Sequence, residues 1–357
     1  MLQVLDIGFS PDDRIGNYRV ERELGPTGSG ILLQARHQVL PRRAIIKVVH
    51  AAFAAAPPYV VQTLREACLL EAIGHPGVPI VYESGLLPDR RPWFAFEVVR
   101  GPTLEDVLAS GRLPVIEVAG LMRDLADILE HAHRRGVVHR GLRPDRIVVT
   151  NDRRYPLCIP DWSEAIAHDA SAAVPPVDDC RAYAAPELAH QGAGCAERVD
   201  DRADMFSLGA IAYRALTGAL PFGEGEGAAP YVAAHEARSD APRGLAAIID
   251  SLLSFDRFDR PSASEVRSDL AWFLRTFPAS ELPQRAAAPE ACETFDEVEV
   301  LREEALGSSE HEVPREQIVL LHQPRMRRPR WTPCVGYVET TDVDIAPALA
   351  EDERLAR

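Results

Sequence analysis

The alternation of apolar and polar residues between positions 18 and 100 predicts a small β-sheet with one helix. The runs YRVERELG and ILLQARHQ flank the glycine-rich segment PTGSG, a pattern typical of a β-hairpin. A third strand-like run, RAIIKVVH, follows. Residues 59–73 then place apolar side chains at three- and four-residue spacing, which predicts a helix. Two more strand-like runs, IVYESG and WFAFEVV, complete the expected sheet.

After residue 101 the pattern changes to that of helices. LEDVLAS predicts a short helix, and VAGLMRDLADILEHAHRRG predicts a longer one that ends at Gly136. A later segment, MFSLGAIAYRAL, is apolar on nearly all sides and is expected to form a buried central helix. One apolar stripe runs along the longer helix and consists of Val118, Leu121, Met122, Leu125, Ile128, Leu129 and Ala132. A boundary between a β-rich and a helical lobe is therefore expected near residue 100.

The periodic pattern is lost beyond about residue 277, where the chain becomes acidic and irregular. We interpret residues 277–357 as a linker or tail, residues 17–276 as one domain, and residues 1–16 as an N-terminal extension. A basic cluster with an adjacent Trp331 interrupts the acidic tail, and we favour a solvated or self-pairing segment there over a docking motif. The cluster consists of Arg325, Arg327, Arg328 and Arg330.

Composition limits the classes of partner and the cellular compartment. A chain of 357 residues with 46% hydrophobic content is long enough for a well-buried core. Its formal net charge of −15 argues against nucleic acid or an anionic membrane as the main partner. The six cysteines lack metal-type spacing, so we expect reduced thiols. No secretory signal or membrane span is apparent, and we expect a cytoplasmic protein.

A glycine-rich loop and a buried lysine are the first candidates for chemistry. Gly25, Gly28 and Gly30 in the predicted hairpin could let backbone N–H groups close over phosphates, although such loops are also common for structural reasons. Lys47 lies in the apolar run AIIKVV, where an unpaired charge costs several kcal/mol. We expect Glu66, on the one helix of this half, to pair with it. The alternative is a simple buried ion pair without a ligand.

With these residues in place, the chain resembles the eukaryotic-type protein kinase family, in its bacterial Ser/Thr-kinase-like branch. The resemblance covers about residues 17–276 and includes three further motifs: His139-Arg140, Asp161-Trp162-Ser163 and Ala185-Pro186-Glu187. It implies an α+β fold with two lobes, a β-rich N-lobe at residues 17–100 and a helical C-lobe at residues 101–276.

The resemblance also implies roles for individual residues. ATP is the expected cofactor, with Lys47 on its α- and β-phosphates, Phe96 as gatekeeper, and Asp161 as the remaining ligand of a weakened Mg²⁺ site. Asp204 would anchor the catalytic loop, and Arg260 would pair with Glu187. The implied nucleotide cleft is formed by Gly25, Gly28, Gly30, Leu32, Lys47, Glu66, Phe96, Glu97, Val99 and Asp161.

Departures from the family pattern gather at the reaction centre. Gly141 stands where the family has the catalytic Asp, Arg143 where it has Lys, and Arg146 where it has Asn. Asp179-Cys180 replaces the usual Gly-Thr before the Ala-Pro-Glu motif. The resemblance implies that all these positions meet where a substrate hydroxyl approaches the γ-phosphate, so no catalytic residue is assigned.

The chemical consequences differ between the two main replacements. General-base work typically contributes about 10²–10⁴ in rate, and Gly141 supplies no side chain for it. Rescue by Asp145 is the less favoured alternative. Arg146 places a cation where the family holds a second Mg²⁺, and we hypothesise that it substitutes for part of the metal's charge. Nucleotide binding would then depend weakly or not at all on Mg²⁺.

Other substitutions modify the surroundings of this centre. Thr27 replaces the middle glycine of the phosphate loop and should stiffen it, while Ser163 replaces the glycine after Asp161-Trp162. We expect Trp162 and His139 to be packing residues. The segment between Asp161 and Glu187 carries Ser163 and Ser171 as its hydroxyls, so Asp178 and Asp179 are considered as a permanent negative partner for Arg140.

Three functions remain open at this point. The preferred one is a pseudokinase that binds ATP or protein partners, such as another kinase or its substrates, and acts in signalling regulation or scaffolding. The second is an active or weakly active Ser/Thr protein kinase, because much of phosphoryl transfer is positioning and charge stabilisation. The third places the function in the tail, with the domain presenting it.

Overall fold

The computed structural model describes residues 8–28, 30–54, 56–167, 181–189, 200–222 and 231–277. Several residues considered above lie outside this part of the chain: Ser171, Asp178, Asp179, Cys180 and all tail residues beyond 277.

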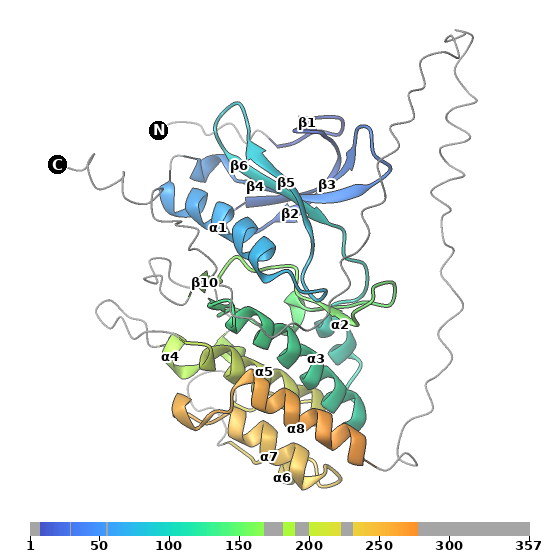
Figure 1. The fold of residues 1–357 in the computed structure, drawn as a ribbon, viewed down its shortest axis with the longest axis vertical. Helices are drawn as coiled ribbons and strands as arrows, with labels where there is room; N and C mark the ends of the chain where they lie inside the picture. The colour runs from blue at the N-terminus through green and yellow to red at the C-terminus, as the bar shows by residue number, and fades with distance from the viewer. Residues whose placement is uncertain are drawn as a thin grey trace, which may run out of the picture. The chain divides into compact units, whose positions relative to one another are not determined.

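The N-lobe is an antiparallel sheet of six strands in the order β1-β2-β3-β4-β6-β5, with helix α1 packed against it (Figure 1). The strands are β1 (Arg14–Ile15), β2 (Tyr18–Pro26), β3 (Gly30–His37), β4 (Arg43–Val49), β5 (Val81–Leu86) and β6 (Pro92–Glu97). A 3-10 turn, η1 (Ala51–Phe53), leads into α1 (Pro57–Ile73). The predicted hairpin and the predicted helix are confirmed, and the sheet also takes in β1, within the residues assigned to the extension.

Local chemistry explains where these elements begin and end. Two prolines open α1, where their missing N–H groups have no helical partner to lose. Gly74 ends the helix with a φ of 56°, in the left-handed region that favours glycine. At Gly30 a Cβ would stand 2.1 Å from the carbonyl oxygen of Val48, so close packing of β3 on β4 also requires a glycine.

The C-lobe is helical, as the sequence predicts. Its helices are α2 (Leu104–Ala109), α3 (Val115–His133), α4 (Pro186–Ala189), α5 (Arg202–Thr217), α6 (Ala234–Ala237), α7 (Arg243–Leu252) and α8 (Ala263–Thr276). Short strands β7 (Val137–Val138), β8 (Val148–Val149), β9 (Leu157–Cys158) and β10 (Ile166–Ala167) lie near the N-lobe, with 3-10 turns η2 (Pro144–Arg146), η3 (Arg181–Tyr183) and η4 (Arg257–Asp259). Helix α3 ends at His133, three residues before the predicted Gly136, whose φ of 70° belongs to the following turn. Within the described residues, no helix is both long and apolar enough to cross a bilayer.

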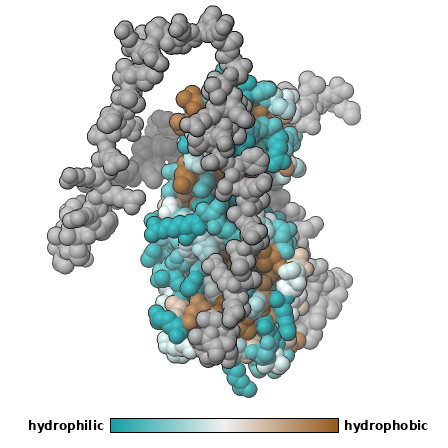
Figure 2. Space-filling model, turned by 90° about the vertical axis from the view of Figure 1, so that its right-hand side faces the viewer, coloured by the Kyte–Doolittle hydropathy of each residue, from teal (hydrophilic) through white to brown (hydrophobic). Residues whose placement is uncertain are grey.

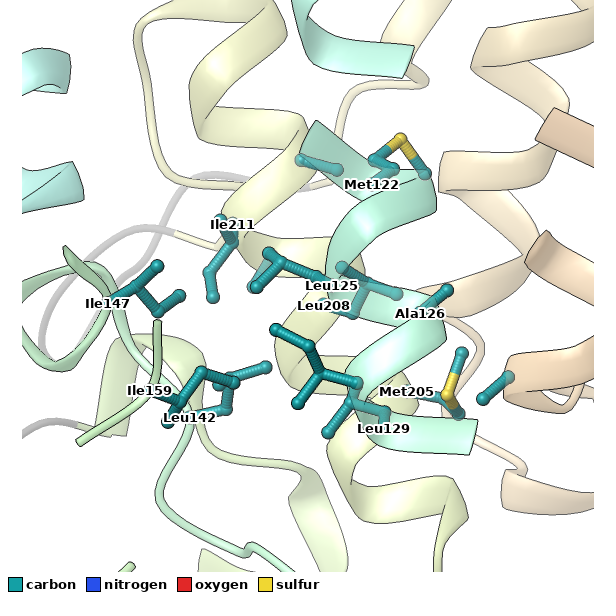
Figure 3. Close-up of a cluster of buried hydrophobic side chains, with 14 of the residues drawn as sticks. Met122, Leu125, Ala126, Leu129, Leu142, Ile147, Ile159, Met205, Leu208 and Ile211 are labelled. Carbon is teal, nitrogen blue, oxygen red and sulfur yellow. The ribbon is translucent and has the colours of Figure 1, made fainter. Parts of the chain in front are cut away.

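The C-lobe core is built around α3 and α5. All residues of the predicted α3 stripe are buried, and α5 is buried along nearly its whole length. Leu142, Ile147 and Ile159 extend from the loops toward Leu125 and Leu208 in the same cluster (Figure 3). The segment between residues 139 and 149 is therefore anchored to the core by its own apolar side chains, which fixes the polar residues between them.

The surface is polar where the interior is not. On the face drawn in Figure 2, hydrophilic side chains predominate over the described residues, and hydrophobic ones form separate patches. This distribution agrees with burial of most apolar side chains in the cores of the two lobes.

A buried ion pair joins α4 to the loop before α8. Arg260 donates from Nη1 and Nη2 to the two carboxylate oxygens of Glu187, at 2.6 and 3.0 Å, and its side chain is fully buried. The predicted pairing of these two residues is confirmed. A fork-shaped contact of this kind fixes the position of α4.

We predict that Arg260→Ala destabilises the fold by about 3–5 kcal/mol, because it leaves the Glu187 carboxylate without its buried cation. Urea unfolding monitored by circular dichroism measures the change. The matched control is Arg19→Ala, which breaks an exposed ion pair with Asp12 and should cost less than about 1 kcal/mol. Equal costs for the two variants would contradict the structural role of the buried pair.

Candidate functional site

A buried ion pair connects the sheet to its one helix. Lys47 on β4 donates from Nζ to Glu66 on α1 at 2.7 Å, and both side chains are less than 5% exposed. The predicted pairing is confirmed. Burial lowers the pKa of Lys47, but the carboxylates of Glu66 and Asp161 raise it by more, so the lysine is charged at neutral pH. Glu66 also accepts the Trp162 backbone N–H at 3.3 Å, which ties α1 to the C-lobe.

The central helix holds the backbone of the His139-Arg140 motif. Asp204 on α5 accepts the backbone N–H of His139 at 2.8 Å and that of Arg140 at 2.7 Å. Arg140 has a φ of 63°, an unusual value for a residue with a side chain, and the two contacts stabilise that conformation. The anchoring geometry predicted for Asp204 is therefore present.

Two aromatic rings fill the space behind this motif. Trp162 and His139 are fully buried, with ring centroids 4.6 Å apart. The indole N–H of Trp162 donates to the carbonyl of Ile159 at 2.8 Å. Burial lowers the pKa of His139, which keeps the ring neutral at pH 7. Both residues pack as the sequence predicts.

Arg146 occupies the centre of the site. Its Nε lies 3.2 Å from Asp161, and its Nη1 lies 2.6 Å from Glu164, with 12% of the arginine side chain exposed. Lys47 stands 3.8 Å from the other carboxylate oxygen of Asp161. Burial raises the pKa of Asp161, but the neighbouring Lys47 and Arg146 cations lower it by more, so it lies well below its ordinary value.

These residues do not fit the pair of magnesium ions that the family uses. A guanidinium has five donors and no lone pair for a metal, and its charge repels a divalent ion close to Asp161. Within the described ranges, no group of three or more His, Cys, Asp or Glu side chains is arranged to hold a metal ion. The contact of the Asp161 carboxylate with Arg146 therefore argues against the weak metal-binding role predicted for Asp161.

The structure also describes Arg143, another position that differs from the family pattern. Arg143 forms an ion pair with Asp145 at 2.9 Å. Because Asp145 is paired in this way, its carboxylate faces Arg143, and rescue of the missing catalytic carboxylate by Asp145 gains no support.

The glycine-rich loop closes on itself. The backbone N–H of Thr27 donates to the carbonyl of Gly30 at 2.7 Å, and the N–H of Gly30 donates to the Thr27 hydroxyl at 3.0 Å. Two amides of the loop, those of Thr27 and Gly30, are thus satisfied within it. Gly25, at a φ of 138°, has a conformation that favours glycine. Phosphate binding by Gly25, Gly28 and Gly30 stays a prediction.

The segment expected to meet adenine contains a contact that the sequence did not reveal. Phe96 is buried and packs on Phe94, with ring centroids 5.4 Å apart. Glu97 forms an ion pair with Arg153 at 2.6 Å, and Arg153 also donates to the carbonyl of Pro76 at 2.8 Å. Arg153 therefore joins the loop after β8 to both β6 and the loop after α1. Leu32 and Val99, also predicted for the cleft, are partly buried.

Comparisons with known proteins agree with this geometry. The chain belongs to the protein kinase domain family, whose model matches residues 18–273. Among curated relatives, serine/threonine-protein kinase PknJ of Mycobacterium tuberculosis is 32% identical over 248 residues, which are 66% of this chain and 41% of PknJ. Serine/threonine-protein kinase Pkn1 of Myxococcus xanthus is 31% identical over 64% of this chain and 33% of its own length. The chain thus spans less than half of the length of these relatives.

A solved structure supports the same fold. The kinase domain of Mycobacterium tuberculosis PknI is 26% identical and superimposes with a TM-score of 0.57. The match covers 74% of this chain and 99% of the PknI domain. The two-lobed kinase fold expected from the sequence is confirmed, with bacterial Ser/Thr protein kinases as relatives.

We predict that Lys47→Met destabilises the fold by about 3–5 kcal/mol, because Glu66 then stays buried without the cation that contacts it at 2.7 Å. The double variant Lys47→Met/Glu66→Gln removes both charges and should recover most of the loss. Urea unfolding of both variants and of the wild type measures this. A single variant as stable as the wild type would contradict the buried ion pair.

Proposed function

We propose that this chain is a pseudokinase, a protein kinase fold that binds ATP with little dependence on Mg²⁺ and acts through protein partners. The observation that carries the proposal is the Arg146 guanidinium, 3.2 Å from Asp161 and beside a glycine at position 141. At this one point the chain lacks the base that orients a substrate hydroxyl and presents a cation where the family places a metal.

The missing base limits the expected rate. A positioned general base contributes about 10²–10⁴ in rate, or about 3–5 kcal/mol of transition-state stabilisation. Gly141 offers no group for this, and Asp145 is engaged by Arg143. Without a metal coordinated between Asp161 and residue 146, charge on the transferring phosphoryl group also loses its main counterion.

Nucleotide binding is supported by what the site retains. Lys47 is charged and held by Glu66, in the position from which the family contacts the α- and β-phosphates. Arg146 adds a second cation at Asp161 without requiring an ion from solution. We propose Leu32, Phe96, Glu97 and Val99 as the adenine-contacting residues, by resemblance.

A second candidate function is a weakly active Ser/Thr protein kinase. It is favoured by the intact Lys47–Glu66 pair and by the Asp204 contacts that hold the loop backbone, since positioning accounts for much of this reaction. For either function we propose a cytoplasmic role with a protein partner, another kinase or its substrates. A function carried by the tail, residues 277–357, concerns a segment that lies beyond residue 277 outside the described residues.

We predict no transfer of label from γ-labelled ATP to the protein itself or to a generic protein acceptor, with Mg²⁺ or with Mn²⁺. The reason is the absent carboxylate at Gly141. The control is Lys47→Met/Glu66→Gln, which lacks the phosphate-contacting lysine without leaving a buried unpaired charge. Label on the wild type that disappears with this control would contradict the pseudokinase proposal and support the weakly active kinase.

We also predict that ATP raises the melting temperature of the full chain to the same extent in EDTA and in excess Mg²⁺. Binding to the folded state alone stabilises it by about 2.7 kcal/mol at a ligand concentration of 100 Kd, which is readily measured. AMP serves as a control for binding through adenine alone. A rise seen only with Mg²⁺ would overturn the idea that Arg146 replaces the metal's charge.

A further inference from the structure

Gly141, Arg146 and Glu164 meet at one point of the site. A Cβ built on Gly141 would lie 2.6 Å from Nη1 of Arg146 and 2.9 Å from both the carboxyl carbon and Oε2 of Glu164. Real Cβ atoms essentially never come within 3.0 Å of such neighbours. The space in which an aspartate side chain would begin at position 141 is thus taken by the ion pair of Arg146 with Glu164.

The backbone of Glu164 is held on both sides of its side chain. Its carbonyl accepts Nε–H of Arg140 at 2.7 Å. The preceding carbonyl, of Ser163, accepts from the side chain of Gln62 on α1 at 2.7 Å. Just after it, Ile166 and Ala167 form β10, which pairs with β7. The carboxylate therefore projects from a backbone that has little freedom to shift.

The Glu164 carboxylate determines how Arg146 can lie. It contacts Nη1 of the guanidinium at 2.6 Å, while Asp161 contacts Nε at 3.2 Å, so two carboxylates engage separate edges of one planar group. Only 12% of each of the Arg146 and Glu164 side chains is exposed, so water screens the pair weakly. Removing Glu164 would leave the arginine with one carboxylate contact, from Nε to Asp161, and with a long hydrogen bond of 3.4 Å from Nη1 to the carbonyl of Gly141.

We propose that Glu164 is a positioning residue that holds the Arg146 guanidinium against Asp161, and that Gly141 leaves the space in which this ion pair lies. The inference rests on the proposed function and identifies what controls metal dependence at the same site. If the Glu164 carboxylate is lost, Arg146 leaves Asp161, and that carboxylate becomes available to a divalent ion. A side chain at position 141 acts in the same direction, because it displaces the ends of both residues.

The test is the affinity for ATP measured by titration calorimetry on the full chain, in EDTA and in excess Mg²⁺. For the wild type, the ratio of the two dissociation constants is expected to be near one. For Glu164→Gln, Mg²⁺ should tighten binding about tenfold or more, the size expected from losing a contact between charged groups. Gly141→Ala should shift the ratio in the same direction.

The matched control is Asp145→Asn, which makes the same carboxylate-to-amide change at the other arginine pair of this loop. Arg143 lies 2.9 Å from Asp145, and neither residue is in contact with Asp161 in an ion pair of the described structure. Its ratio should stay near one. A ratio near one for Glu164→Gln as well, with metal-independent binding by the wild type, would overturn the positioning role and leave the proposed function standing.

A second measurement separates this inference from the proposed function. If the wild type needs Mg²⁺ or binds no ATP, the proposed function fails, and a double-mutant cycle of Arg146→Gln and Glu164→Gln in urea decides the inference. If Glu164 positions Arg146, the effects of the two substitutions on the unfolding equilibrium constant should be coupled by about tenfold. The control cycle of Arg143→Gln and Asp145→Asn should show a smaller coupling. Additive effects of Arg146→Gln and Glu164→Gln would overturn it.

Discussion

The organisation of the site depends on the charge balance around Asp161. This carboxylate lies between the Lys47 ammonium, at 3.8 Å, and the Arg146 guanidinium, at 3.2 Å. The two cations belong to different lobes and are each held by a further carboxylate, Glu66 for Lys47 and Glu164 for Arg146. Four of these five side chains are largely buried, and Asp161 is a third exposed. Because buried charges are tolerated only when paired, the five form a network in which the buried members depend on their neighbours. In a kinase that binds metal at this carboxylate, ions from solution supply part of the positive charge beside it. Here the Arg146 guanidinium supplies positive charge at Asp161.

Contacts from both lobes hold these five residues in place. Helix α1 carries Glu66 inward, and the Trp162 backbone is bonded to the same glutamate. Helix α5 holds the His139-Arg140 backbone through Asp204, and Leu142 with Ile147 fixes the loop in the core (Figure 3). The Lys47–Glu66 ion pair and the Asp204 contacts to the loop backbone are thus combined with a glycine at position 141. In our account this scaffold is retained for binding nucleotide and protein partners.

The parts of the structure that were predictable from the sequence have local or pairwise causes. The hairpin before Lys47, the α1 helix and the α3 stripe follow from apolar periodicity, and a buried lysine demands an acidic partner, which Glu66 supplies. Glu187 and Arg260 were paired through the family resemblance. The roles of Glu164 and Arg153 were missed, because each depends on contacts between segments far apart in the chain and on the direction of one side chain. The sequence signal for Glu164 was a carboxylate directly after Asp161-Trp162-Ser163, in a chain that has an arginine at position 146. The ion pair that fills the space beside Gly141 could only be seen once the neighbouring side chains were placed.

The central claim is that Arg146 takes the place of a metal at Asp161, and the affinity of bound ATP for Mn²⁺ tests it most directly. Water-proton relaxation can measure the dissociation constant of Mn²⁺ from ATP free in solution and from ATP bound to the full chain. By thermodynamic linkage, a site that binds ATP independently of metal cannot make bound ATP hold Mn²⁺ more tightly than free ATP does. We predict equal constants for the wild type and tighter Mn²⁺ binding for Arg146→Asn, which restores an oxygen ligand beside Asp161. Tighter Mn²⁺ binding to ATP on the wild-type protein than to free ATP would contradict the account.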